Sequence, residues 1–462
     1  MTNRTIVQKF GGTSLGSPER MMKVAKIIKK SWQKQKTLVV VSAISNLDKE
    51  TGTTSLLLKA SGSALQKIDP QPFLALIQEN HLNIINELIA DSKNRQNVKN
   101  FVDKELSQLN HFLRAVEVVG ELSSRSSDLI LSTGERLSAM LLSVVLQSIS
   151  VPARFLPLED IIIDSGISQV NRHFHTLLRA NITKRLNTLT DEVPVLTGFI
   201  GKVPGGILAG IGRGYTDFTA ATVAASLTVD ELQIWKDVDG VYSADPKQIK
   251  NAYVVPKLSP EEAAEITYYG AEVIHPFTIE QVIKDGIPVR IKHSLKPDLP
   301  GTVIIADAAG DEQIHNKPVA VTIKRNVQVL NIKSNRMLMA HGFMSSVFNV
   351  LNANRVVIDL IATSEVSISL TADSNISIMN AVLELKKIAE VSVLKNMAIL
   401  SLVGRGMNRS VGTAAKMFST LAKQDVNIEM ITQGASEINI SCVINDKDHL
   451  KALRVVHDAM LL

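Results

Sequence analysis

The stretch Lys9-Phe10-Gly11-Gly12-Thr13-Ser14 joins an apolar segment to a helical one near the start of the chain. Residues 5–10 have the partly alternating apolar pattern of a short strand. After the glycines, Ser17 can cap a helix, Pro18 suits the first helical position, and residues 38–41 have the composition of a buried strand. This order of strand, glycine turn, helix and strand predicts an α/β fold.

The glycine turn is also a candidate phosphate site. Glycines lack a Cβ, so a ligand can approach the backbone closely, and their N–H groups can point at phosphate oxygens. Lys9 adds a positive charge at the same place. The spacing matches neither the P-loop nor the dinucleotide-binding fingerprint. From this stretch alone, a tight turn with a surface lysine is an equally good interpretation.

The composition limits the classes of protein that the chain can belong to. A length of 462 residues suggests about two to four domains, and a net charge of +5 without a long basic block argues against nucleic-acid binding. The single cysteine, Cys442, excludes an internal disulfide and a cysteine-rich zinc site. Without an apolar run of about 18 residues or a signal-peptide pattern, we expect a cytoplasmic protein with no membrane partner.

Polar side chains follow several predicted strands. Ser42 comes directly after residues 38–41, and Thr54 lies shortly beyond it, at the edge where open α/β sheets bind ligands. A solvated loop is the alternative. Residues 55–130 are predicted to form a mostly helical lobe. Glu135 precedes an apolar helix at 137–149, but Ser132-Thr133-Gly134-Glu135 also fits a capping box, which would make Glu135 purely structural.

A second glycine-rich region follows the predicted strand at 193–199. It ends in Gly212-Arg213-Gly214-Tyr215-Thr216-Asp217, and a helix is predicted at 218–227. A guanidinium between two glycines suits bidentate binding of a carboxylate or phosphate, whereas Thr216 or Asp217 can instead cap the helix. The strand at 232–235 then runs into a polar rim that contains Lys236, Asp237, Tyr242 and Lys247. We interpret His275 as a structural histidine.

The last third of the chain contains an internal repeat. After a linker at 306–317, each copy has a strand, a glycine loop, a helix and two strands, with the first copy at 329–370 and the second at 399–443. A strand is expected at 356–361, and a final helix at 447–460. Neither copy carries an acid–base cluster, so we expect ligand-sensing or dimerisation modules.

Several motifs in order resemble the aspartokinase family. They are Lys9–Ser14, Gly134-Glu135, Gly212–Asp217, Asp237–Pro246 and Tyr269–Pro276, with Met339–Met344 and Val357–Glu365 resembling its ACT regulatory region. The resemblance implies a monofunctional form with an α/β fold. A carbamate-kinase-like, three-layer αβα domain would span 1–305, and ferredoxin-like ACT regions would span 318–395 and 396–462. A strand near 319–323 would complete the second ACT region, and a homodimer or larger assembly is expected.

The family implies transfer of the γ-phosphoryl group of ATP, with Mg²⁺, to the β-carboxylate of L-aspartate. This reaction gives 4-phospho-L-aspartate and is the first step of lysine, threonine and methionine biosynthesis. A carboxylate nucleophile is already ionised at neutral pH and needs no general base. The protein must instead hold two anions in line and neutralise the charge of the moving group.

The motifs also imply site residues. Lys9 would contact the transferring phosphate, assisted by Gly11, Gly12 and Ser14. Arg213 would bind the α-carboxylate of aspartate and Glu135 its ammonium, with Asp217 orienting Lys9 or the substrate. Ser42, Thr54 and Thr216 would line the amino-acid pocket, and Lys236, Asp237, Tyr242 and Lys247 would border the nucleotide. Two departures are Glu272, where some members have lysine, and Tyr215, where many have glycine. No protein ligand to the metal is assigned.

The ACT loops resemble those of the threonine-inhibited branch. Lysine remains an alternative effector, because Asp359 can meet an ammonium. The candidate effector residues are Met337, Gly342, Phe343, Met344, Asp359, Thr363 and Ser364. Two other functions stay open: a kinase for glutamate or acetylglutamate that uses the same phosphate site, and a catalytically inactive amino-acid sensor.

Overall fold

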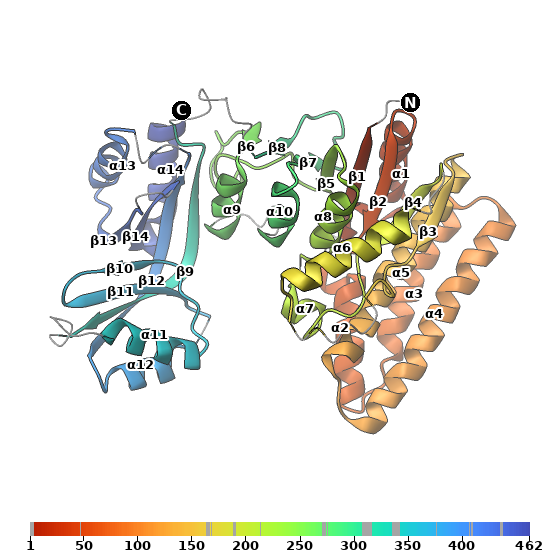
Figure 1. Cartoon of the computed structure of the whole chain (residues 1–462), viewed down its shortest axis with the longest axis horizontal. Coiled ribbons are helices and arrows are strands. Elements are labelled where there is room, and N and C mark those ends of the chain that lie inside the picture. Colours follow the sequence, from red (N-terminus) through yellow and green to blue (C-terminus); the bar gives the residue numbers. More distant parts are fainter. Residues whose placement is uncertain are drawn as a thin grey trace. The chain divides into compact units, whose positions relative to one another are not determined.

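The chain folds into two compact units (Figure 1). The computed structural model describes residues 4–46, 48–162, 167, 169–187, 191–212, 214–269, 274, 276–306, 317–334, 342–375, 377–405, 407, 410–434 and 438–462. The first unit comprises Met1–Val241, Pro256–Pro260 and Ile274–Ala306, and the second comprises Tyr242–Val255, Glu261–Val273 and Asp307–Leu462.

The first unit is built on a mostly parallel sheet. Among the described residues it has eight strands in the order β3-β4-β2-β1-β5-β7-β8-β6. The central strand β1 (Thr5–Phe10) pairs in parallel with β2 (Lys36–Val41) and β5 (Glu231–Lys236). The others are β3 (Ala153–Leu156), β4 (Val193–Thr197), β6 (Lys257–Leu258), β7 (Val289–His293) and β8 (Thr302–Ile304). Because β1, β2, β4, β5 and β7 run in parallel, their carboxyl ends share one edge of the sheet.

Helices cover both faces of this sheet, which gives the three-layer arrangement expected from the sequence (Figure 1). On one face, α1 (Pro18–Trp32) and α5 (Ser124–Ser148) share a core with Val39 and Val195. On the other, α8 (Tyr215–Leu227) packs on β1, β2 and β5 and is flanked by α6 (Arg172–Leu186) and α10 (Pro276–Ile283). Coverage on both sides explains why the strands are almost uninterrupted runs of buried residues.

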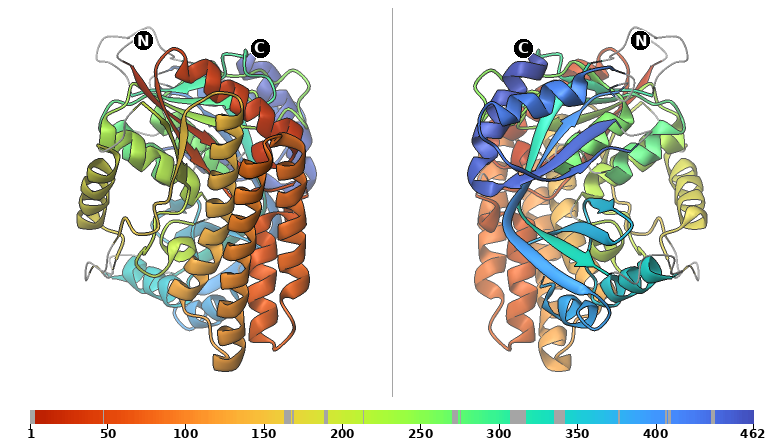
Figure 2. Two further views of the ribbon diagram at one scale, coloured as in Figure 1. Left: turned by 90° about the vertical axis from the view of Figure 1, so that its right-hand side faces the viewer. Right: turned by 90° about the vertical axis from the view of Figure 1, so that its left-hand side faces the viewer.

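The predicted helical lobe contains long helices that extend away from the sheet (Figure 2). These are α2 (Thr53–Leu65), α3 (Gln71–Leu88) and α4 (Ser92–Val119), which pack against one another and against α5. By length and composition alone α5 would suffice to cross a membrane, but 78% of its most apolar window is buried. A helix buried in a protein core also meets these criteria of length and composition.

The second unit is an antiparallel sheet with helices on its face. Its strands lie in the order β10-β11-β9-β12-β14-β13. The long strands β9 (Ala320–Lys333) and β12 (Glu390–Val403) pair with each other in both halves, so that Ala320–Lys324 lies beside Ile399–Val403 of the second repeat copy. The remaining elements are β10 (Ile361–Thr363), β11 (Ser367–Asp373), β13 (Ile428–Thr432), β14 (Asn439–Asn445), α11 (Phe343–Ala353), α12 (Met379–Leu385), α13 (Thr413–Ala422) and α14 (His449–Leu461).

Two expectations about strands are wrong. The strand expected at 356–361 begins only at Ile361, because Val356 still closes α11 by donating its N–H to the Leu351 carbonyl. The N–H of Leu360 donates to the side-chain oxygen of Thr371 instead of a ladder carbonyl. In addition, the apolar pattern at 289–291 predicts the last strand of the first unit, but β8 follows it and pairs antiparallel with β7.

Two segments from before residue 306 pack with the internal repeat in the second unit. The Ser243 carbonyl accepts from the Val321 N–H, and its hydroxyl lies 3.0 Å from His457 Nε2. Helix α9 (Pro260–Tyr269) also makes polar contacts with this region: Tyr268 donates to Asp359 at 2.8 Å, and Glu262 accepts from the Arg405 N–H at 2.8 Å. Helix α9 therefore contacts residues of both repeat copies.

The turn before β8 supplies a stability test. Gly301 has a φ of +71°, and an added Cβ would lie 1.9 Å from the Ile291 carbonyl oxygen. We expect Gly301→Ala to lower the free energy of unfolding by about 3 kcal/mol or more, because backbone strain and a steric clash add. At Gly286 φ is +66°, but an added Cβ meets none of the described residues within 4 Å.

Gly286→Ala is thus the matched control and should cost only the strain, about 1–2 kcal/mol. Urea unfolding followed by circular dichroism measures both variants. Equal losses in the two variants would contradict the close approach at Gly301.

Candidate active site

The carboxyl edge of the first sheet holds a buried cluster of charges centred on Asp217. Lys9 Nζ lies 2.6 Å from Asp217 Oδ1, and Lys236 Nζ lies 3.1 Å from Asp217 Oδ2. Lys9 stands near the end of β1 and Lys236 at the end of the adjacent β5, while Asp217 comes from α8. Lys9 is 6% exposed and Asp217 4% exposed. One carboxylate therefore joins two ammonium groups in a site largely shielded from water.

Burial and charge act against each other in this cluster. Burial pushes the pKa of the Asp217 carboxyl upward, but Lys236 and Lys9 outweigh it and hold that pKa well below its usual range. Burial lowers the pKa of the Lys9 ammonium, and Asp217 opposes that change. Glu135 also raises the pKa of Lys9, so its carboxyl belongs to the same electrostatic environment.

Asp217 reaches the lysines because α8 begins earlier than the sequence suggested. The helix was expected to start at Phe218, with Thr216 or Asp217 as a possible cap. It starts at Tyr215, preceded by Gly214, and no side chain caps it. Asp217 therefore lies in the first helical turn, where a carboxylate also interacts favourably with the helix dipole. The capping alternative for Asp217 is wrong.

The capping-box alternative for Glu135 is wrong as well. Helix α5 begins at Ser124, and the Ser123 hydroxyl caps it by accepting from the Ser126 N–H. Glu135 is therefore deep inside the helix and is only 1% exposed. Tyr215 donates its hydroxyl proton to Glu135 Oε1 at 2.5 Å. Burial raises the pKa of Glu135 to about 7, although this hydrogen bond works in the opposite direction.

Small residues let the elements of the site approach closely. A Cβ on Gly12 would lie 2.3 Å from the Ala43 carbonyl oxygen, so the turn after β1 touches the segment after β2. A Cβ on Gly134 would lie 2.7 Å from Ala43 Cβ, and one on Gly198 would lie 2.6 Å from Thr216 Cγ2. These contacts bring the ends of three strands together with α5 and α8.

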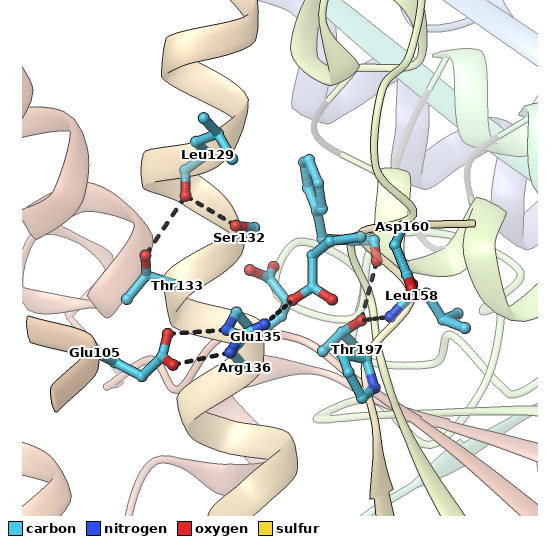
Figure 3. Close-up of polar contacts among 12 residues, drawn as sticks. Glu105, Leu129, Ser132, Thr133, Glu135, Arg136, Leu158, Asp160 and Thr197 are labelled. Atoms are coloured by element: carbon cyan, nitrogen blue, oxygen red, sulfur yellow. Dashed lines mark hydrogen bonds and ion pairs between the residues drawn. The ribbon is translucent and has the colours of Figure 1, made fainter. Parts of the chain in front are cut away.

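Residues around Glu135 hold α5 and the end of β4 in place (Figure 3). Arg136, the next residue of α5, donates to both oxygens of Glu105 on α4 at 2.9 and 2.8 Å. At the end of β4, the Thr197 hydroxyl accepts from the Leu158 N–H and donates to the Phe199 carbonyl. The helix that carries Glu135 is therefore anchored at the neighbouring residue.

A second polar group lies next to the glycine turn. The buried Ser14 hydroxyl donates to Ser294 Oγ at 3.0 Å, and Ser294 donates to Asp237 Oδ1 at 3.3 Å. Arg20 donates to both oxygens of Asp237 and to the Thr13 carbonyl. Asp237 is thus held against the turn by the chain's own arginine. Arg20 and Ser294 were not singled out from the sequence.

The remaining expected site residues divide into three groups. The first group lies in the first unit, at the starts and ends of the elements described above: Gly11, Ser42, Thr54 and Thr216. The second group belongs to the second unit and consists of Tyr242 and Lys247, whose roles stay predictions. The third group lies outside the described residues: Arg213, Met337, Glu272 and His275. Next to the half-buried Thr54, Thr53 is buried, and its hydroxyl has no hydrogen-bond partner among the described residues. Nothing in the local sequence distinguishes the two threonines.

The expected effector residues all belong to the second unit. Asp359 Oδ1 accepts from Lys324 Nζ at 2.6 Å and from the Tyr268 hydroxyl at 2.8 Å. Gly342 precedes α11 with a φ of +88°, Phe343 packs on the core below that helix, and Met344 is exposed. Thr363 ends β10, and the Ser364 hydroxyl lies 2.7 Å from the Ser367 hydroxyl.

Comparison with known proteins decides the family. The amino acid kinase family model matches residues 4–293, and an ACT domain model matches residues 400–460. An aspartokinase of Candida albicans is 40% identical over 495 residues, which cover 100% of this chain and 90% of that protein. The chain belongs to the aspartokinase family. The resemblance inferred from the motifs is thereby confirmed.

Solved structures of the aspartokinase family agree with this fold. Escherichia coli aspartokinase III in complex with aspartate and ADP has a TM-score of 0.78 at 26% identity, covering 99% of this chain and 100% of that chain. The same enzyme in complex with lysine and aspartate has a TM-score of 0.76 at 26% identity, again covering 99% and 100%. An amino-acid-kinase catalytic domain with an ACT regulatory region is therefore the fold of this chain.

The charge cluster makes a stability prediction. Replacing Asp217 by asparagine leaves two ammonium groups close together without a buried counter-charge, so Asp217→Asn should lower the free energy of unfolding by about 3–5 kcal/mol. The matched control is Asp298→Asn, which breaks the solvent-exposed pair with Lys30 and should change stability little. Chemical denaturation of both variants measures the difference, and equal midpoints would contradict a buried cluster.

Proposed function

We propose that this chain transfers the γ-phosphoryl group of ATP to the β-carboxylate of L-aspartate and gives 4-phospho-L-aspartate. The observation that carries the proposal is the buried Lys9–Asp217–Lys236 cluster beside Glu135 at one edge of the sheet. Two fixed ammonium groups suit an anionic phosphoryl group, and a buried carboxylate suits the ammonium of an amino acid.

The cluster explains how the chain can neutralise charge on the transferring group. Asp217 opposes the lowering of the Lys9 pKa by burial and orients the Lys9 ammonium, while the backbone N–H groups of Gly11 and Gly12 add further donors. The acceptor carboxylate needs no base. In this proposal Arg213 binds the α-carboxylate of aspartate, as the family motif implies.

Magnesium belongs to the proposal as a partner of the nucleotide. When bound, the ion neutralises phosphate charge and orients the phosphoryl group. No cluster of three His, Cys, Asp or Glu side chains in the described part of the chain is arranged to hold a metal. The polar site instead offers lysines and glycine N–H groups, which fit phosphate oxygens, so we propose that the phosphates supply most metal ligands.

Lys9→Ala should lower kcat by about 10²–10³-fold, because a preorganised positive charge at the moving group is lost. Formation of aspartyl hydroxamate with ATP and Mg²⁺ measures the rate, and circular dichroism checks folding. Lys23→Ala, which removes an exposed lysine paired with Glu19, is the matched control and should retain full activity. A normal kcat for folded Lys9→Ala would refute this role.

The same assay separates the proposal from its rivals. Equal or better turnover of glutamate or acetylglutamate would identify a different amino-acid kinase. Absence of turnover with all three acids, together with intact amino-acid binding, would identify a sensor.

The raised pKa of Glu135 predicts a pH dependence. The carboxyl binds an ammonium only when ionised, so kcat/KM for aspartate should fall as the pH drops below about 7. Free aspartate does not titrate between pH 5.5 and 8, so the change does not come from the amino-acid substrate. Glu135→Gln should raise KM for aspartate about 10–100-fold, remove this acid limb and leave KM for ATP unchanged. An unchanged KM for aspartate would contradict the assignment.

We further propose feedback inhibition through the ACT region, with threonine favoured as the effector. The Asp359 carboxylate, which could meet the ammonium of lysine, already accepts from the chain's own Lys324 and from Tyr268. Lys324 therefore already supplies this carboxylate with a positive charge, which makes a second ammonium beside it less favourable. Pairing of ACT regions between two or more chains, and a cytoplasmic location, are parts of the same proposal.

Inhibition assays test the effector. Threonine should inhibit the native chain more strongly than lysine, and Lys324→Met should increase inhibition by lysine, because the Asp359 carboxylate loses its internal cation. Lys333→Met, an exposed lysine on the same strand, is the control. Stronger inhibition of the native chain by lysine than by threonine would contradict the proposal.

A further inference from the structure

We propose that Tyr215 is a positioning residue for the amino-acid pocket, whose hydroxyl occupies one oxygen of Glu135 and leaves the other to receive the ammonium of the substrate. The inference rests on the proposed function and deepens it. It makes Tyr215 a determinant of selectivity for α-amino acids over dicarboxylic acids that lack the amino group.

The two carboxylate oxygens of Glu135 have different surroundings. Glu135 Oε1 accepts from Tyr215 at 2.5 Å, and both side chains are buried, Tyr215 being 5% exposed. Glu135 Oε2 is also buried and makes no hydrogen bond of good geometry among the described residues, although the Ala43 backbone N–H also favours the ionised carboxyl. A buried carboxylate oxygen without a donor is costly, and an ammonium ligand would supply the missing donor.

In the hydrogen bond between Tyr215 and Glu135, the proton belongs to the phenol. Burial and the neighbouring Glu135 raise the pKa of Tyr215 well above its usual value, so the phenol stays protonated and acts only as a donor. Its hydrogen bond stabilises the ionised form of Glu135 and counters the effect of burial. The same contact therefore fixes the orientation of the carboxylate and favours the charge that attracts an ammonium.

The first turn of α8 connects the proposed amino-acid pocket at Glu135 with the proposed phosphate site at Lys9. Tyr215 and Asp217 lie in the same first turn of α8, two residues apart, with one bonded to Glu135 and the other to Lys9. One rigid helical turn thus sets the separation between the group that would hold the amino acid and the group that would meet the phosphate.

Kinetics of Tyr215→Phe test the inference, since phenylalanine keeps the ring and removes only the hydroxyl. We expect KM for aspartate to rise about 10-fold or more at pH 7, while kcat and KM for ATP change less than about 3-fold. The acid limb of kcat/KM for aspartate should move to higher pH, because Glu135 loses the donor that favours its ionised form. Tyr253→Phe, at an exposed tyrosine, is the matched control and should leave all parameters unchanged.

Succinate is the decisive probe, because it has both carboxylates of aspartate but no ammonium. Its inhibition constant should stay the same or fall in Tyr215→Phe, so the preference for aspartate over succinate should drop about 10-fold or more. A purely packing role would weaken both ligands together. Parallel losses for aspartate and succinate, or an unchanged KM and pH profile, would overturn the inference.

These experiments distinguish failure of the proposed function from failure of the role assigned to Tyr215. Absence of aspartyl hydroxamate with the native chain would refute the proposed function, whereas normal native activity with an unaltered Tyr215→Phe would refute only the role of Tyr215. If Tyr215→Phe does not fold, Tyr215→His provides a second variant with a smaller aromatic ring that still carries a donor. It should retain the aspartate preference in part, and complete loss of this preference in folded protein would overturn the inference.

Discussion

A buried carboxylate between two lysines is the interaction on which the proposed active site depends. Asp217 bonds Lys9 and Lys236 at 2.6 and 3.1 Å, and the three residues come from α8 and from two adjacent parallel strands. Burying one ammonium alone would be unfavourable, and burying two would be more so, unless a counter-charge lies between them. The sheet edge can therefore present positive charge to a phosphoryl group only because α8 starts early enough to insert Asp217.

The first turn of α8 organises the whole edge. Its tyrosine reaches Glu135 on α5, its aspartate reaches Lys9 on β1, and Thr216 lies against Gly198 after β4. Glycine is needed at 198 because a side chain there would collide with Thr216, and at 12 and 134 because side chains there would collide with Ala43. In the proposed function, binding of a phosphate and binding of an amino acid therefore both depend on this one turn. In the second unit, α9 carries a comparable set of polar contacts to the ACT sheet.

Much of this was accessible from the sequence, and the reasons for the rest are physical. The apolar pattern at 5–10, the glycine turn and the helix from Pro18 follow from local chemistry, and so does Lys9 as a candidate. The local pattern does not show where Glu135 lies in its helix. Ser-x-x-Glu fits a helix cap, whereas α5 is buried against the sheet and begins as far back as Ser124. The local pattern could not reveal the partner of Tyr215, which lies 80 residues away. Only packing of α5 against α8 brings those two side chains together.

The most direct test of the central claim is a crystal structure of the chain with ADP, Mg²⁺ and aspartate. The account predicts that Lys9 Nζ lies within hydrogen-bond distance of the nucleotide phosphates or the acceptor carboxylate. It also predicts the aspartate ammonium on Glu135 Oε2, with Tyr215 still on Oε1. Nucleotide and aspartate bound away from the Lys9–Asp217–Lys236 cluster, with that cluster contacting neither ligand, would contradict it.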